Sequence, residues 1–361
     1  MKVFINYPFG NTELEMHQRS KKLFSVSMEN GFNSRRIIET ALQIKEPLKM
    51  IPYIERIEQS SHNHYAVCFC MLIEKIASIK VDPTVQIIRT ILLELERIYS
   101  HSIYLSRMFY YIENPILINH TTTTKDSLLD CFEEITGHRM FGTPHVFGDI
   151  NFNLSSGNIK LIEKVIEETI ANLNKIKKLA NRNPSLESLF RHNVSIGETD
   201  ILQNKSTGPF SWFNGLNQDL REKEPYLAYD DPQIQTILEN KGAINGNCIY
   251  SRILRIISDA DNSIKIIKFL TDKHDIVYHR KDELQQPSLT KGEYTQTIES
   301  PRGVLEIRIC VNKAGDIETI NITSPSDINK IILKNVLKGV LVDYTRPAFE
   351  SLYLSMMEID K

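Results

Sequence analysis

The feature that most constrains the fold is a long apolar stretch, residues 82–112, which carries charged groups at or near helical spacing. Arg89, Glu94, Arg97 and His101 recur every three to five residues in it. The residues around them are large and aliphatic: Ile87, Ile88, Ile91, Leu92, Leu93, Leu95 and Ile98. A helix this apolar is expected to be buried, and each buried charge then needs a partner, because an unpaired one costs on the order of several kcal/mol. The alternative is a polar stripe that faces water.

Periodicity along the rest of the chain predicts a mainly α fold with small α+β parts. Helices are expected near residues 35–46, 64–79, 82–112, 125–137, 157–180, 249–271 and 326–339. Asp82 is the expected N-cap of the third of these, and Pro83 fits its first turn, where a missing N–H costs nothing.

Strands are expected to be few. The β-branched, alternating segments 304–311 and 317–323 predict an antiparallel hairpin that turns at Ala314-Gly315-Asp316. The run Thr121–Thr124 and the region Asn181–Pro184 are interpreted as loops. The sequence therefore predicts a long-helix bundle with a small sheet near the C-terminus.

Composition excludes several functional classes. The 361 residues carry a net charge of −2, so no basic field for nucleic acid is present. No apolar run reaches the roughly 18 residues that span a bilayer, and the N-terminus has no signal-peptide pattern. Five sparse cysteines indicate a reducing cytoplasm. Neither a glycine-rich nucleotide-binding loop nor a G-x-S-x-G elbow occurs, so NADH, if it is a substrate, is oxidised by another chain.

Short motifs recur in a fixed order along the chain. They are Glu55-Arg56-Ile57, Ile88-Arg89 to His101, Thr136-Gly137-His138-Arg139-Met140, Thr207-Gly208-Pro209, Asp219-Leu220-Arg221, Pro225-Tyr226 with Tyr229-Asp230, Tyr250 to Arg255, Glu299-Ser300-Pro301-Arg302-Gly303, and Met357-Glu358-Ile359-Asp360-Lys361. In this order they resemble the large-subunit family that energy-converting [NiFe]-hydrogenases share with respiratory complex I. The resemblance implies one domain over 1–361, with a short divergent segment at 1–30, a helical core at 31–285, and a β-hairpin plus C-terminal segment at 286–361.

The ligands of a nickel site are missing. The resemblance implies two C-x-x-C pairs in hydrogenases, because soft metals take thiolates. Here the first pair falls on Glu58 and Ser61, and the final residues contain no cysteine. Cys68 and Cys70 point about 200° apart on a helix and are interpreted as small buried hydrophobes. We expect no metal and no cofactor to be bound by this chain.

Complex I also lacks these thiolates, and the resemblance implies that the vacated cavity takes a quinone. Glu58, Gln59 and Ser61 on the loop, together with Asp219, Arg221 and Asp360, are the implied catalytic residues, with quinone as the probable substrate. The loop departs from complex I at Gln59, where a tyrosine donates to the quinone head group. Other departures are the missing N-terminal histidines, with only His17 present, Phe141 where complex I has a histidine, Asp149 in a glycine turn, and Val304 in place of a glutamate.

Arg56 matches the arginine that packs against the terminal [4Fe-4S] cluster of a partner subunit, where a fixed positive charge would raise the potential. The implied structural charge network is Arg89, Glu94, Arg97, His101 and Arg139. Simpler interpretations exist for several of these residues. Arg56 pairs with Glu55 or Glu58, His101 is a hydrogen-bonded core histidine, and Asp219 caps a helix or pairs with Arg221. His62 and His64 are interpreted as solvated loop histidines.

Two functions follow from the resemblance. In the first, the chain is a subunit of an NADH:quinone oxidoreductase-like or related ferredoxin- or formate-linked complex. Its partners are then an iron–sulfur small subunit and a membrane-embedded subunit, and it lies on the cytoplasmic face of the inner membrane. In the second, it is a degenerate member that serves as a structural or assembly scaffold without electron transfer. Gln59, Phe141 and the missing histidines favour the second, and the retained loop acids and Asp219-Leu220-Arg221 favour the first.

Overall fold

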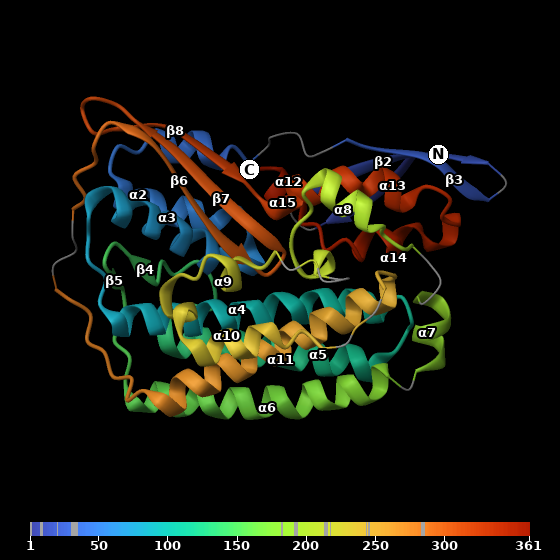
Figure 1. Cartoon of the computed structure of the whole chain (residues 1–361), viewed down its shortest axis with the longest axis horizontal. Coiled ribbons are helices and arrows are strands. Elements are labelled where there is room, and N and C mark those ends of the chain that lie inside the picture. The colour runs from blue at the N-terminus through green and yellow to red at the C-terminus, as the bar shows by residue number, and fades with distance from the viewer. Residues whose placement is uncertain are drawn as a thin grey trace.

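The computed structural model shows a mainly helical chain built in two layers (Figure 1). The structure describes residues 2–7, 10–19, 21–29, 35–181, 183–190, 194–212, 216, 218–242, 244, 246–282 and 286–361. One layer is a bundle of long helices, and the other holds two small antiparallel sheets with short helices around them. The predicted fold class, a long-helix bundle with a small C-terminal antiparallel sheet, is confirmed.

The bundle layer consists of α4 (Pro83–Tyr110), α5 (Pro115–Thr136), α6 (Ser156–Ala180) and α11 (Ile249–Lys273). Asp82 caps α4 by accepting a hydrogen bond from the backbone N–H of Thr84 at 2.8 Å, and Pro83 occupies the first turn, as predicted. Helices α5 and α11 both pack on α4, and α6 closes the bundle by packing on α5 and α11. No helix among the described residues is both long and apolar enough to cross a membrane.

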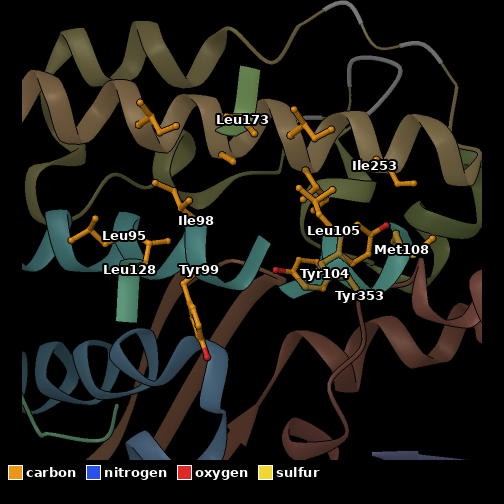
Figure 2. Packing of buried hydrophobic residues seen from close by; sticks show 14 of the residues in the cluster. Leu95, Ile98, Tyr99, Tyr104, Leu105, Met108, Leu128, Leu173, Ile253 and Tyr353 are labelled. Atoms are coloured by element: carbon orange, nitrogen blue, oxygen red, sulfur yellow. The ribbon is translucent and has the colours of Figure 1, made fainter. Parts of the chain in front are cut away.

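The core of the bundle is aliphatic where the helices meet. Figure 2 shows Leu95, Ile98 and Leu105 of α4 between Leu128 of α5 and Ile253 of α11. All five side chains are buried. Burying a leucine or isoleucine contributes roughly 1.5–3 kcal/mol, so this stripe anchors α4 and fixes which way its polar residues face.

The second layer contains the C-terminal sheet, with strand order β6-β7-β8. Its strands are β6 (Gly292–Ser300), β7 (Gly303–Val311) and β8 (Ile317–Thr323), all antiparallel. The predicted hairpin is present, with Ile307 opposite Ile322, and β6 is a third strand that the sequence did not predict. Helices α2 (Pro47–Ile54) and α3 (His62–Ala77) share one hydrophobic core with this sheet.

An N-terminal sheet lies beside short C-terminal helices (Figure 1). It consists of β1 (Lys2–Tyr7), β2 (Gly10–Arg19) and β3 (Lys22–Glu29), in that order. The expectation of few strands missed this sheet. Leu23 donates to the carbonyl of Val340 at 2.8 Å, which fastens the first thirty residues to the last thirty. Pro8 and Phe9, part of the segment expected to be shortened, lie outside the described residues.

The remaining helices and strands are short. They are α1 (Ile37–Leu42), η1 (Glu55–Ile57), η2 (Gln59–Ser61), β4 (His145–Val146), β5 (Asp149–Ile150), α7 (Pro184–Phe190), α8 (Glu198–Asn204), η3 (Pro209–Ser211), α9 (Leu220–Lys223), η4 (Leu227–Asp230), α10 (Pro232–Glu239), α12 (Pro325–Asn329), η5 (Lys330–Ile332), α13 (Leu333–Leu337), η6 (Val342–Tyr344), α14 (Thr345–Glu350) and α15 (Met356–Ile359).

Three predictions about local structure were wrong. The Thr121–Thr124 run is helical, because α5 begins ten residues earlier than the predicted start at residue 125 and its threonine hydroxyls donate to carbonyls of the preceding turn. The predicted helix at 326–339 is broken into α12, η5 and α13. The predicted helix at 35–46 ends at Leu42, and α2 starts at Pro47, which cannot continue a preceding helix.

Candidate functional site

The Glu55–Ser61 loop consists of η1 and η2, two short turns between α2 and α3. Glu58 separates the turns in an extended conformation, and its carboxylate caps the second by accepting from the backbone N–H of Ser60 at 3.0 Å. The same carboxylate accepts from the Ser60 hydroxyl at 2.7 Å and from the hydroxyl of Ser355. An acidic residue at position 58 therefore shapes the loop itself, whatever further role it has.

Arg302 completes the surroundings of Glu58. It lies in the turn between β6 and β7, and its Nη1 is 3.4 Å from the Glu58 carboxylate. Its Nη2 donates to the Ser60 hydroxyl at 2.7 Å, and its guanidinium covers the ring of Tyr353 at 4.8 Å from the centroid. Burial alone would raise the pKa of Glu58, but Arg302, followed by the hydroxyls of Ser355 and Ser60, holds it below the usual range.

The C-terminus meets the loop at this point. Burial, together with the nearby charge of Glu58, raises the pKa of Glu358 to about 7 against the opposing effect of Arg302. Ser326 donates to Glu358 through its backbone N–H and its hydroxyl, while the second carboxylate oxygen of Glu358 is buried with no partner. Glu58, a position of the first expected cysteine pair, and Glu358, in the C-terminal segment where the second pair was expected, are thus both influenced by the charge of Arg302, and neither supplies a thiolate.

Two of the recurring motifs pack directly on each other to hold Arg302. The backbone of Gly208 is left-handed, with φ of +87°, and an added Cβ there would lie 2.0 Å from the carbonyl oxygen of Arg302. Across the contact, Gly303 has φ of +135° and approaches Thr207 and Gly208. The hydroxyl of Thr207 accepts from the N–H of Val304 at 3.2 Å. This close backbone approach explains why both segments carry glycine.

A cavity of about 310 Å³, called here the loop cavity, lies between the loop, α4, α5 and the C-terminus. Its lining residues are Glu58, Gln59, Ser60, Tyr99, Ser102, Ile103, Ser106, Arg107, Thr121, Thr122, Lys125, Arg302, Ser355, Met356 and Met357. A second, more open cavity of about 720 Å³, called here the outer cavity, is lined by Arg35, Ile37, Thr40, Tyr53, Arg56, Gln59, Met140, Phe141 and Met357. Gln59 and Met357 line both cavities and therefore form the wall between them.

Arg56 lies on the outer side of the loop and is about half exposed. Its guanidinium is 5.5 Å from the ring centroid of Phe141, and it bonds to the carbonyl of Pro52 and to Glu55. Glu55 is buried and accepts from the backbone N–H and hydroxyl of Thr143. Arg56 and Phe141 are the two positions at which the sequence was compared with the cluster-facing residues of complex I, and they are neighbours in space.

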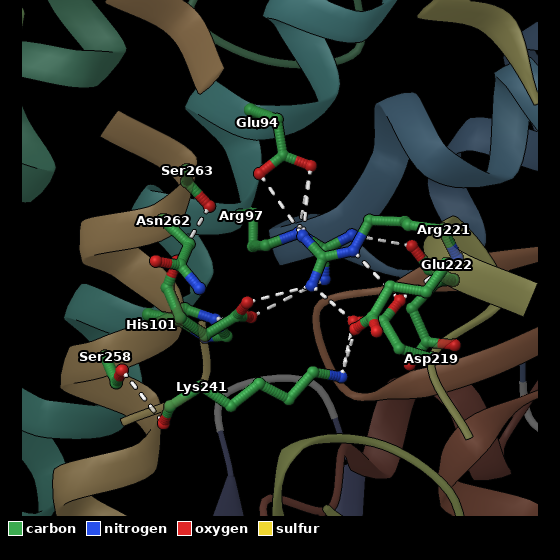
Figure 3. Close-up of polar contacts among 12 residues, drawn as sticks. Glu94, Arg97, His101, Asp219, Arg221, Glu222, Lys241, Ser258, Asn262 and Ser263 are labelled. Atoms are coloured by element: carbon green, nitrogen blue, oxygen red, sulfur yellow. Dashed lines mark hydrogen bonds and ion pairs between the residues drawn. The ribbon is translucent and has the colours of Figure 1, made fainter. Parts of the chain in front are cut away.

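The central buried charges form one closed network, shown in Figure 3. Arg221 contacts Glu94 at 3.2 Å, Asp219 at 2.8 Å and Asp259 at 2.8 Å, and Arg97 contacts Glu94 at 3.3 Å. All five side chains are buried. Burial would raise the pKa of Asp259, but Arg221, His101 and Arg97 hold it well below the usual value. The three acids therefore remain charged beside the two arginines.

Asp219 and His101 fit the simpler interpretations. Asp219 caps α9 by accepting from the N–H of Arg221 at 3.0 Å and also pairs with its guanidinium. His101 is a core histidine: its Nε2 is 2.8 Å from Asp259, and its Nδ1 is 3.0 Å from the Tyr353 hydroxyl. Asp259 was missed by the sequence analysis, although an acid within the isoleucine-rich segment at 249–271 is the same signal that drew attention to α4.

Arg89 and Arg139 do not belong to this network, contrary to the prediction. Arg89 pairs with Glu74 at 2.7 Å and lies eight residues before Arg97, which is about 12 Å along a helix. Arg139 is on the surface and pairs with Asp130 and Glu133 of α5. Its spacing on the same helix suggested that Arg89 joins the network. The partner of Arg89 instead comes from α3, whereas the partners of Glu94 include Arg221 of α9.

The interpretation of His62 and His64 as solvated loop residues was wrong. Both are buried in the first turn of α3, where Glu96 of α4 lies 2.9 Å from His62 Nδ1 and 2.6 Å from His64 Nδ1. Glu96 also accepts from the backbone N–H groups of Asn63 and His64, so it caps the free donors of the α3 N-terminus. Burial would raise the pKa of Glu96, but His62 and His64 hold it well below the usual value. Glu96, missed from sequence, is what orders this turn.

The remaining predicted positions are buried without forming a metal site. Ser61 has a buried hydroxyl with no partner, and Asp360 closes α15. Cys68 and Cys70 are buried, and burial raises the pKa of both thiols. Within the described ranges, no three His, Cys, Asp or Glu side chains are grouped so that they could hold a metal ion.

The chain combines a bundle of long helices, which encloses paired acids and arginines, with the loop cavity beside α4. Residues 117–284 match the family described as respiratory-chain NADH dehydrogenase, 49 Kd subunit. The D-type subunit of NADH-quinone oxidoreductase from Campylobacter concisus is 24% identical over 98% of this chain and 91% of its own length. The same subunit of Clostridium beijerinckii is 24% identical over 98% of this chain and 96% of its own length. That of Desulfotalea psychrophila is 24% identical over 86% of this chain and 82% of its own length. Over most of its length the chain is therefore similar to the D subunits of NADH-quinone oxidoreductase, and over residues 117–284 it matches the 49 Kd subunit family.

Proposed function

We propose that this chain is the large subunit of a complex I-like, membrane-associated oxidoreductase and that the loop cavity receives a quinone-type substrate. The observation that carries this proposal is the convergence of the Glu55–Ser61 loop, the Arg302 turn and the C-terminal residues Ser355 to Met357 on one cavity. These three segments, far apart in sequence, supply its walls together with α4 and α5. The names of the relatives, all of them NADH-quinone oxidoreductase subunits, support the same substrate class.

The lining chemistry suits a quinone head group. Ligand pockets usually combine an apolar surface with a few directed polar groups, in volumes of roughly 300–1,000 Å³. The loop cavity, at about 310 Å³, has Ile103, Met356 and Met357 as apolar walls and hydroxyl and amide groups on the loop side. A flat ring bearing two carbonyl oxygens needs both kinds of contact. A quinone isoprenoid tail would have to leave through the open side of the cavity.

The outer cavity supports the second part of the proposal, an iron–sulfur partner. Arg56 and Phe141 face outward there, separated from the loop cavity by the side chains of Gln59 and Met357. A [4Fe-4S] cluster held by a small subunit on this face would lie one side chain away from the substrate. The positive charge of Arg56 would stabilise the reduced cluster. In this proposal the chain docks, through its complex, on a membrane-embedded subunit at the cytoplasmic face of the inner membrane.

The scaffold alternative has one observation in its favour. The Glu58 carboxylate is fully engaged by Arg302, Ser60 and Ser355, and Gln59 donates to the sulfur of Met140 at 3.3 Å. The side chains of Glu58 and Gln59 are thus satisfied by other groups of the chain. In a scaffold, these contacts would persist. In a redox subunit, the Gln59 amide would leave the Met140 sulfur and donate a hydrogen bond to the substrate.

The test is performed on the complex isolated anaerobically through an N-terminal tag, because the C-terminal residues are buried at the site. The complex is reduced with dithionite, a short-chain benzoquinone is added, and cluster reoxidation is followed by electron paramagnetic resonance. The proposal expects quinone-dependent reoxidation that Ser106→Phe slows at least tenfold by filling the loop cavity. Thr84→Phe, at a half-buried position in the first turn of α4 and outside the cavity, is the matched control. A complex without clusters, or reoxidation insensitive to Ser106→Phe, would favour the scaffold.

A further inference from the structure

Among the described residues that line the loop cavity, Tyr99 is the one that carries a phenol. It lies on α4 and is 3% exposed, and in Figure 2 its ring leaves the bundle layer and points toward the blue part of the chain. Its neighbours on α4, Leu95 and Ile98, point into the bundle core. Tyr99 is therefore placed at the boundary where the bundle ends and the cavity begins.

The hydroxyl of Tyr99 has a weak partner. It donates to the thioether sulfur of Met140 at 3.7 Å, and the side-chain amide of Gln59 donates to the same sulfur at 3.3 Å. A thioether is a poor acceptor, and here it serves two good donors. A carbonyl oxygen in the cavity would be a better acceptor for both. Gln59 and Tyr99 come from different elements, so their convergence on one atom is set by tertiary packing.

Ser102, and Glu58 with the groups that hold it, have stronger partners than the Met140 sulfur. The hydroxyl of Ser102 donates to the carbonyl of Ile98 in its own helix at 2.8 Å. Glu58 is held by Arg302, Ser60 and Ser355, as described above, so neither the carboxylate nor these donors are free to turn toward a ligand without leaving a buried charge unpaired. Tyr99 and Gln59 would lose only a hydrogen bond to a thioether sulfur on turning to a ligand, which costs less free energy than breaking these contacts.

The surroundings also keep the phenol protonated. Burial, and then the negative charges of Glu96 and Glu58, raise the pKa of Tyr99 above its ordinary value. The hydroxyl is thus a hydrogen-bond donor throughout the physiological pH range.

We infer that the Tyr99 hydroxyl, with the Gln59 amide beside it, donates a hydrogen bond to one carbonyl oxygen of the quinone-type ligand. This inference rests on the proposed function and deepens it. The family tyrosine of the loop is absent at position 59, and a phenol reaches the same cavity from α4 instead. Tyr99 is then a ligand-binding residue, and Met140 is the acceptor that it leaves when the ligand arrives.

The experiment measures binding of a short-chain benzoquinone to the isolated complex by titration calorimetry. Tyr99→Phe keeps the ring and removes the donor, so the Kd should rise about 3- to 10-fold, the value of one hydrogen bond. The matched control is Tyr104→Phe on the same helix, whose hydroxyl donates to the Ser351 carbonyl at 3.5 Å outside the cavity. It should leave the Kd within about twofold of the wild-type value, because no cavity donor is lost.

Met140→Leu is a second, independent variant. It removes the competing sulfur while both donors remain, so the Kd should be equal to that of the wild type or lower. The inference fails, while the proposed function stands, if Tyr99→Phe binds the quinone as tightly as the wild type. It also fails if Met140→Leu raises the Kd about 3- to 10-fold. If the wild-type complex does not bind the quinone at all, both fail together.

Discussion

The two polar regions on either side of α4 differ in how completely their groups are satisfied. In the Glu94–Arg221 network every charge has opposite charges at hydrogen-bond distance, and the cavity beside it measures only about 10 Å³. In the loop cavity two donors share a sulfur, and outside its lining the buried hydroxyl of Ser61 and one oxygen of Glu358 have no partner among the described residues. The first region holds helices together. The second has polar groups whose hydrogen bonds are weak, so these groups are available to bind a ligand.

The largest expected effect comes from breaking the closed network. Arg221→Met should lower the free energy of unfolding by about 3–5 kcal/mol, because it leaves Asp219, Asp259 and Glu94 buried with unmatched charge. Chemical denaturation measures the change. Arg139→Met, on the surface, is the control and should leave stability unchanged. Equal stability of the two variants would show that the network is not structural.

The effect of Glu96, which binds the first turn of α3, depends on pH. Its folded pKa lies below the ordinary value of 4.5, so its stabilisation is present above pH 4.5 and is lost as pH falls through the folded pKa. Although burial opposes it, Glu96 raises the pKa of His62 above 6.5, so that contribution is complete below pH 6.5 and is lost as pH rises through the folded pKa.

Glu96→Gln should therefore cost about 1.5–3 kcal/mol, with the largest difference from wild type between about pH 4.5 and 6.5. Unfolding curves recorded from about pH 4 to 8 measure this difference. Glu163→Gln, exposed on α6, should show none. A difference that does not vary with pH would mean that the Glu96–His62 pair is not charged in the folded protein.

Gly208 packs against the backbone of Arg302, which lines the loop cavity, and is not part of the network. Gly208→Ala adds a Cβ to a left-handed residue 2.0 Å from the Arg302 carbonyl, so it should cost about 1–3 kcal/mol and displace Arg302. Quinone binding should weaken along with stability. Gly157→Ala, on α6 with its nearest contact at 3.4 Å, is the control for both measurements. If Gly208→Ala lowers stability but leaves quinone affinity unchanged, the contact between Gly208 and Arg302 does not shape the binding site.

The smallest effect on stability, and the sharpest on redox behaviour, is expected at Arg56. Because this side chain is half exposed, Arg56→Ala should leave folding and assembly intact. Loss of its positive charge should lower the midpoint potential of the partner cluster and slow quinone reduction. Redox titration of the complex measures the shift, with Lys160→Ala on α6 as control. An unchanged potential would place the cluster away from the outer cavity.

Local pattern predicted much of the scaffold. The α4 cap at Asp82 and Pro83, the long helices of the bundle and the β7–β8 hairpin all follow from periodicity and turn residues, which act within a few positions of the chain. The same reasoning failed for the Thr121–Thr124 run and for His62 and His64. In each case a polar residue that favours a loop in isolation is helical because a nearby group accepts its hydrogen bond. For the threonines this group is a carbonyl of the preceding turn, and for the two histidines it is Glu96.

The sequence by itself determined that α4 would carry charges into an apolar interior, that no set of thiolates remains for nickel, and that Gln59 stands where the family loop has a tyrosine. Only the tertiary structure decided which charges pair, because Asp259, Glu96 and Arg302 reach their partners from distant segments. It also placed the phenol of Tyr99 beside Gln59. Neither residue has a local signal for that role, since which face of a helix borders a cavity depends on what packs around it.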